Sequence, residues 1–299
     1  MRIQKKQMKG FLLVMAASAL YGLSPLFITS LSENGAHFSN VMFYKGGISA
    51  LELALISRLS HKRMRLTRRE NRYTMLLGAL RGLTCFFLFG AYEWITTGLA
   101  TSIHFTFPLF VMLISVLVFR VKPQASGIVS LIMTLTGIAL FAWNASGNAA
   151  SGWGILFAII SAVMYATYLV ALDRCDIGRI PPMVYAMYEM AYTAVFALVT
   201  STMIGKMSFT LTPTGWLVAI AGATLTATCV IMMKIGIKEI DAQKASILCV
   251  LEPIVSVVAG ALVIHEIVTM KTAVGVALVI GATVVTVLMS GKQETSDIP

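Results

Sequence analysis

Ten apolar stretches, each of about 20 residues, follow one another along the chain and are joined by short connections. A helix needs about 20 apolar residues to cross the hydrocarbon layer of a bilayer, where it satisfies its own backbone hydrogen bonds. The pattern therefore predicts an all-α integral membrane protein with ten transmembrane helices. We expect these spans at Lys9–Thr29, Phe38–Ser57, Tyr73–Glu93, Leu99–Phe119, Gln124–Trp143, Trp153–Leu172, Met183–Ile204, Gly215–Ile235, Ala242–Ile264 and Thr269–Met289.

The composition agrees with a chain that lies almost entirely in the membrane. Of its residues 58% are hydrophobic and only 12% are charged, whereas a soluble domain usually carries about a quarter charged residues. The basic N-terminus followed by an apolar run resembles a signal peptide, but the run is long enough to span, so we interpret it as the first transmembrane helix. The four cysteines have neither metal-ligand spacing nor a disulfide pattern, and we expect no metal and no cofactor.

The basic residues predict the orientation of the chain in the membrane. If the N-terminus is cytoplasmic, 19 of the 23 Lys and Arg residues fall on the inner side, and Lys206 and Lys271 fall outside. This distribution follows the positive-inside rule, so we expect a multi-pass protein of the cell membrane with both termini in the cytoplasm. The basic loop between the second and third spans favours anionic lipid headgroups as partners over nucleic acid.

Two pairs of similar segments indicate an internal repeat. "FLLVMAASALYG" (Phe11–Gly22) resembles "ILFAIISAVMYA" (Ile155–Ala166), and "ATSIHFTFPLF" (Ala100–Phe110) resembles "ASILCVLEPIV" (Ala245–Val255). The two offsets differ by a single residue, so the halves correspond along their length. An odd number of spans per half inverts the second half relative to the first, which is typical of transporters. We therefore expect two inverted five-helix repeats, 1–143 and 153–290, around a central cavity, with a cytoplasmic tail at 291–299.

Several segments resemble the EamA-type branch of the drug/metabolite transporter superfamily. They are "ALYG" (Ala19–Gly22), "AYEWITTGLATSIHFTFPLF" (Ala91–Phe110), "VMYATYLVALDR" (Val163–Arg174) and the long stretch Gly236–Ala282. The resemblance implies ten helices around a central cavity that opens alternately to the two sides. In this chain Phe107 stands in the first half where Glu252 stands in the second, and Val121 stands where Glu266 does. A site that uses these carboxylates is therefore asymmetric.

Glu252 is the main candidate for a substrate-binding residue. It stands beside Pro253 in an apolar run, and its helical face includes the small residues Ala245 and Cys249 rather than large apolar ones. A charge at membrane depth is costly and often functional. Two interpretations remain open: a substrate or proton site at a loosened helix, or a carboxylate tied to a neighbouring helix beside a structural kink.

Three of the other charged residues within the predicted spans are further candidates. Lys45, Arg81 and Glu189 are candidates for the same substrate site. The structural alternative is an ion pair between helices, either Arg81 with Glu189 or Lys45 with Glu189. Glu52 lies near the inner surface and is expected to be structural, paired either with Lys45 or with a neighbouring helix.

Four uncharged candidates complete the expected site. His104 could relay protons, although a single membrane histidine more often packs through a hydrogen bond. Phe107 replaces the carboxylate in the first half, and Tyr21 and Tyr165 occupy equivalent positions in the repeat, where they are expected to line the cavity. Glu93, Lys234 and Glu266 lie near helix ends, where solvation is easy, and are expected to be structural.

These features favour a secondary transporter over an enzyme or a channel. The chain has no catalytic motif, and it has no symmetric charge ring or selectivity filter. A cavity with both signs of charge favours a small polar or amphoteric metabolite, an amino acid or related compound, moving outward. The alternative is a carrier of organic cations or drugs. The sequence leaves open whether protons are coupled to transport and whether the protein forms a homodimer.

Overall fold

The computed structural model describes residues 2–59, 65–95, 97–122, 125–145, 151–175, 177–205, 207–259 and 270–293. In these ranges the chain is helical and has no strand. Within these ranges, each of the ten predicted spans overlaps one helix or two consecutive helices. The helices are α1 (Arg2–Tyr21), α2 (Ser24–Glu33), α3 (Phe38–Leu59), α4 (Arg68–Tyr92), α5 (Thr97–His104), α6 (Phe107–Leu117), α7 (Ala125–Ala145), α8 (Gly152–Arg174), α9 (Pro182–Met203), α10 (Pro213–Ile240), α11 (Ala242–Cys249), α12 (Leu251–Ala259) and α13 (Met270–Gln293).

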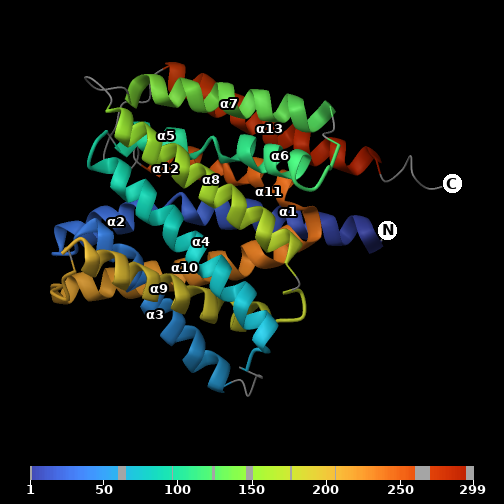
Figure 1. Cartoon of the computed structure of the whole chain (residues 1–299). Coiled ribbons are helices and arrows are strands. Elements are labelled where there is room, and N and C mark those ends of the chain that lie inside the picture. Colours follow the sequence, from blue (N-terminus) through green and yellow to red (C-terminus); the bar gives the residue numbers. More distant parts are fainter. Residues whose placement is uncertain are drawn as a thin grey trace.

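The apolar helices make this a membrane protein. In the described residues, six helices or continuous helix pairs are long and apolar enough to cross a bilayer, and two shorter apolar helices lie within α7 and α13. The six are Lys6–Glu33, Arg68–Tyr92, Leu99–Leu117, Gly152–Arg174, Pro182–Met203 and Pro213–Ile240. Helix α1 begins and α13 ends on the same side of the bundle, at the right of Figure 1.

The two halves of the chain pack against each other rather than forming separate bodies. Helix α3 packs on α9, and α7 packs on α13, and these two pairs form opposite edges of the bundle (Figure 1). Between them α1 packs on α10 and α4 packs on α8. Each pair joins a helix that ends by residue 145 with one that begins after residue 151, so the core of the protein lies between the halves.

Three spans are broken in the part of the chain that the structure describes, and each break lies four residues before a proline. Proline has no N–H to donate to the carbonyl group four residues earlier. Helix α1 ends at Tyr21 ahead of Pro25, α5 ends at His104 ahead of Pro108, and α11 ends at Cys249 ahead of Pro253. The expectation that Pro253 interrupts its helix is therefore confirmed, and the same chemistry interrupts two more spans.

Two of these breaks are in contact. At Gly22, just after α1, an added Cβ atom would lie 2.5 Å from Cβ of Val255 and 2.7 Å from the carbonyl oxygen of Glu252. Only glycine permits this approach, because a methyl group would meet the backbone of α12. The contact places the end of α1 directly against the Glu-Pro step.

Candidate functional site

Arg81 and Glu189 form an ion pair in the core. Nε of Arg81 lies 3.8 Å from Oε1 of Glu189, and the Glu189 side chain is completely buried. The guanidinium group also donates a hydrogen bond to the Tyr21 hydroxyl at 2.5 Å. Of the two pairings that the sequence left open for Glu189, the structure has the one with Arg81.

A ring of tyrosines surrounds this ion pair. The Arg81 guanidinium carbon lies 5.4 Å from the ring centroid of Tyr21 and 5.5 Å from that of Tyr168, within the range of a cation–π contact. Tyr168 and Tyr185 are fully buried and interact with the Glu189 carboxylate, although neither hydroxyl has a direct hydrogen bond of good geometry. The negative charge of Glu189 is therefore balanced mainly by its electrostatic attraction to the Arg81 guanidinium group.

Lys45 is buried but has no carboxylate in contact. Its Nζ donates a hydrogen bond to Oγ of Ser24 at 2.6 Å, and only 3% of the residue is exposed. Among the described residues, no carboxylate oxygen lies within 4.0 Å of this ammonium group, the limit for an ion pair. A positive charge is thus held in the core without a direct counter-charge.

Glu252 has the opposite charge and is also without a direct partner. In the part of the chain that the structure describes, its carboxylate makes no hydrogen bond and no ion pair within 4.0 Å. It nevertheless interacts electrostatically with Arg81 and Lys45. Unlike Lys45, Arg81 and Glu189, which are buried, Glu252 is partly exposed. Its carboxylate is thus unpaired in a residue that is not fully enclosed.

His104, Phe107 and Tyr165 form an aromatic cluster at the other broken helix. Nδ1 of His104 lies 2.6 Å from Oγ of Ser161, and its ring centroid lies 5.4 Å from that of Tyr165. Phe107 is fully buried and meets Tyr165 edge-on, with their ring centroids 4.7 Å apart. The equivalent residues Tyr21 and Tyr165 therefore have different surroundings: one contacts Arg81, and the other packs in the aromatic cluster.

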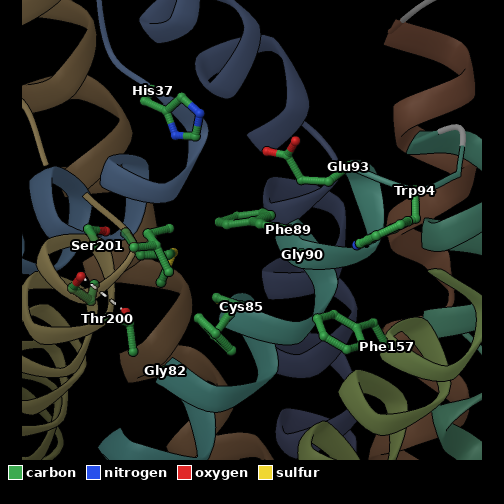
Figure 2. A pocket seen from close by; sticks show the side chains of 14 residues that line it. His37, Gly82, Cys85, Phe89, Gly90, Glu93, Trp94, Phe157, Thr200 and Ser201 are labelled. Carbon is green, nitrogen blue, oxygen red and sulfur yellow. Dashed lines mark hydrogen bonds between the residues drawn. The ribbon is translucent and has the colours of Figure 1, made fainter. Parts of the chain in front are cut away.

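Two of the cavities formed by the described residues lie at opposite ends of the bundle, and none of the eight candidate residues lines either one. One has a volume of about 290 Å³ and lies between α3, α4 and α9 (Figure 2). Its inner end is formed by Gly82 and Cys85, and Cys85 interacts electrostatically with Lys45, Arg81 and Glu252. The other, of about 160 Å³, is lined by residues of α6, α7, α8 and α11, including Pro108.

A family profile described as "EamA-like transporter family" matches residues 8–143 and 152–288. The chain belongs to the EamA-like transporter family. The two matched segments correspond to the two repeats of the family and fall on either side of the connection between α7 and α8. EamA family members are membrane transporters of the drug/metabolite transporter superfamily, which agrees with a function other than catalysis.

Solved structures share the fold of this EamA-like chain. One, titled "Crystal structure of protein", matches with a TM-score of 0.79 and 20% sequence identity, and the match covers 94% of this chain and 98% of that one. In all, 29 chains of solved structures match. No curated protein matches the chain.

The structure adds residues that sequence reasoning missed. Ser24 and Tyr168 contact the charged groups; Tyr168 lies three residues after Tyr165, and this spacing could have pointed to it. The expectation that Lys234 is solvated near a helix end was wrong. It is only 3% exposed, and its Nζ donates to the carbonyl oxygen of Ile180, so the solvation expected near a helix end does not occur.

The remaining expectations concern Glu52, Glu266 and the loop between the repeats. Glu52 accepts a hydrogen bond of 3.0 Å from the Thr224 hydroxyl on α10, so of the two pairings left open for it the structure has the one with a neighbouring helix. Glu266 lies outside the described residues, as do residues 146–150 of the expected loop between the repeats.

Proposed function

We propose that this protein is a secondary transporter that exports a small amphoteric metabolite, an amino acid or related compound, by alternating access. One observation carries the proposal. Lys45 and Glu252 come from opposite halves of the chain and have opposite charges, and neither has an oppositely charged group in contact among the described residues. A zwitterion would supply a carboxylate for Lys45 and an ammonium group for Glu252.

Their position within membrane-spanning segments makes these two charges effective ligands. A charge inside a membrane protein interacts strongly with an opposite charge, because little water screens it. It also has a large cost when it stays unpaired. A bound zwitterion would offset that cost at both positions at once, whereas a neutral ligand would leave it in place.

The proposal includes ten transmembrane helices in two inverted repeats. The packing pattern supports this architecture: exchanging the halves converts the α1–α10 pair into the α8–α4 pair and leaves the α3–α9 and α7–α13 pairs unchanged. A two-fold relation between five-span halves has this property. Such halves can rock about a site at their interface and open it to each side in turn.

The proposed topology places both termini in the cytoplasm and the segment Asn144–Gly152 outside. A cysteine introduced at Ser146 should react with a membrane-impermeant thiol reagent added to intact cells, whereas one at Arg65 should not. Protection at Ser146 together with labelling at Arg65 would invert the topology.

A ligand screen tests the proposed substrate class. Thermal stability of the purified protein is measured with a panel of amino acids, nucleosides and quaternary amines, and we expect stabilisation by amino acids. Stabilisation only by permanent cations would favour the second candidate, a carrier of organic cations. That candidate has an observation of its own: Glu252 is partly exposed, whereas Lys45 is buried and bonded to Ser24.

Glu252→Gln tests proton coupling. This variant keeps the shape of the side chain and removes its charge. If Glu252 binds the ammonium group of the substrate, counterflow and proton-driven accumulation should fall together. If it instead carries a proton, counterflow should survive while accumulation fails. Wild-type activity in both assays would show that Glu252 has neither role.

A further inference from the structure

The cavity between α3, α4 and α9 is lined by none of the central charged residues. Its wall on α4 is a helical stripe that runs from Gly82 through Cys85, Phe86 and Phe89 to Glu93. Apart from the adjacent pair Cys85 and Phe86, successive residues of this stripe are three or four positions apart, so they lie on one face of the helix. The volume of about 290 Å³ is close to the lower limit for pockets that hold drug-sized molecules.

The body of the cavity is aromatic. Phe86, Phe89, Trp94 and Phe157 all line it, and Figure 2 shows the Phe89 and Phe157 rings with the Trp94 indole around the hollow. Such walls suit an apolar or aromatic group, and the faces of the rings also attract cations. The lining residues that the structure describes include no Lys and no Arg.

A single carboxylate stands at the mouth of the cavity. Glu93 follows the last turn of α4 and is exposed, and Figure 2 shows its carboxylate group above Phe89, on the side that faces His37. Among the described residues, no Lys or Arg nitrogen lies within 4.0 Å of it. Trp94 beside it is 54% exposed, as expected for an indole at a membrane–water interface. The mouth thus combines a negative charge with an interfacial aromatic residue.

We propose that this cavity binds a lipophilic organic cation, with its apolar body between the aromatic rings and its ammonium group beside Glu93. Two features of the site recognise the positive charge: the carboxylate and the ring faces. The apolar walls recognise the body. A neutral amphiphile or a lipid acyl chain would satisfy only the walls. This site shares no residue with the proposed zwitterion site, so either can exist without the other.

Binding of 4-phenylbutyltrimethylammonium to the purified protein in lipid nanodiscs tests the proposal, with 4-phenylbutanol as the neutral probe. We expect saturable binding of the ammonium probe. Glu93→Gln should weaken it about fivefold, because an exposed charge pair is lost, and Phe89→Leu should weaken it by a similar factor. Binding of 4-phenylbutanol should be unaffected by Glu93→Gln. Glu33→Gln, which removes an exposed carboxylate outside the cavity, is the matched control and should change neither.

Alkylation of cysteines locates the bound probe. Cys85 lies at the inner end of the cavity, and Cys175 follows the far end of α8. Both are free thiols, so the ammonium probe should slow alkylation of Cys85 and leave Cys175 unchanged. The proposal is overturned if Glu93→Gln leaves binding of the ammonium probe unchanged, or if Glu33→Gln weakens it equally. It is also overturned if Cys85 is not protected at saturating probe.

Discussion

The core holds two pairs of opposite charges, and they differ in what each charge touches. Arg81 and Glu189 lie 3.8 Å apart and are enclosed by tyrosines. Lys45 contacts a serine hydroxyl, and Glu252 has no contact partner of opposite charge among the described residues. The first pair neutralises itself. The second leaves both charges available, and the difference separates a structural pair from a candidate binding pair.

The free energy of burying an uncompensated charge explains why the two pairs should respond differently to mutation. Removing one member of a buried contact pair leaves the other without compensation and destabilises the fold. Removing a charge that has no direct counter-charge in the folded protein eliminates a cost instead. Mutations in the first pair should therefore change stability, whereas mutations in the second should change ligand binding.

The largest effect is expected for Glu189→Gln. It leaves the Arg81 guanidinium buried without its carboxylate, and breaking a buried pair typically costs about 3–5 kcal/mol. Thermal unfolding of the purified protein measures the loss. The double variant Arg81→Gln/Glu189→Gln removes both charges and should recover part of the stability. A single variant as stable as the wild type would show that the two groups do not neutralise each other.

Lys45→Met should show the reverse pattern. Stability should hold or rise, because a buried ammonium group without a contacting carboxylate is removed. Binding of the stabilising amino acid should weaken about thirtyfold, the loss expected for a hydrogen bond to a charged group. Equilibrium binding and thermal unfolding measure the two effects, and Lys9→Met, at an exposed position of α1, serves as the control. A clear loss of stability with binding intact would make Lys45 structural.

Gly22→Ala probes the contact between the two broken helices. The added methyl group would lie 2.7 Å from the carbonyl oxygen of Glu252, so α12 must shift. Overpacking of this kind costs about 1–3 kcal/mol, and the shift should also lower transport. Gly47→Ala is the matched control, because its Cβ would meet only Cβ of Ala194 at 4.0 Å. Equal behaviour of the two variants would mean that α12 does not depend on this approach.

The smallest effect is expected for His104→Asn. The side chain would keep a hydrogen bond to Ser161, and no charge is lost if the imidazole is neutral. Transport should stay within about threefold of the wild type across pH 6 to 8. A loss as large as that of Lys45→Met, or a changed pH profile, would assign His104 to proton transfer.

The spans and the break at Pro253 were predictable because their causes are local. Apolar length identifies a membrane helix, and a missing proline N–H acts on the carbonyl group four residues away. The pairing of Arg81 with Glu189 was not predictable, because it joins residues more than a hundred positions apart and Lys45 was an equal competitor. The cavity at Glu93 was missed for a related reason. It forms only where α3 and α9 pack beside α4, and the pattern of residues along α4 alone does not predict which helices pack against it.

The central claim is that Lys45 and Glu252 hold the two ends of one zwitterion. The direct test measures binding of an amino acid, its decarboxylated amine and its deaminated acid to the wild type, Lys45→Met and Glu252→Gln. Loss of the ligand carboxylate should weaken binding to the wild type and have little effect in Lys45→Met. Loss of the amine should likewise have little effect in Glu252→Gln. The contrary result is that each change to the ligand weakens binding by the same factor in the wild type and in both variants. Neither residue would then contact the ligand group assigned to it, and the claim would be wrong.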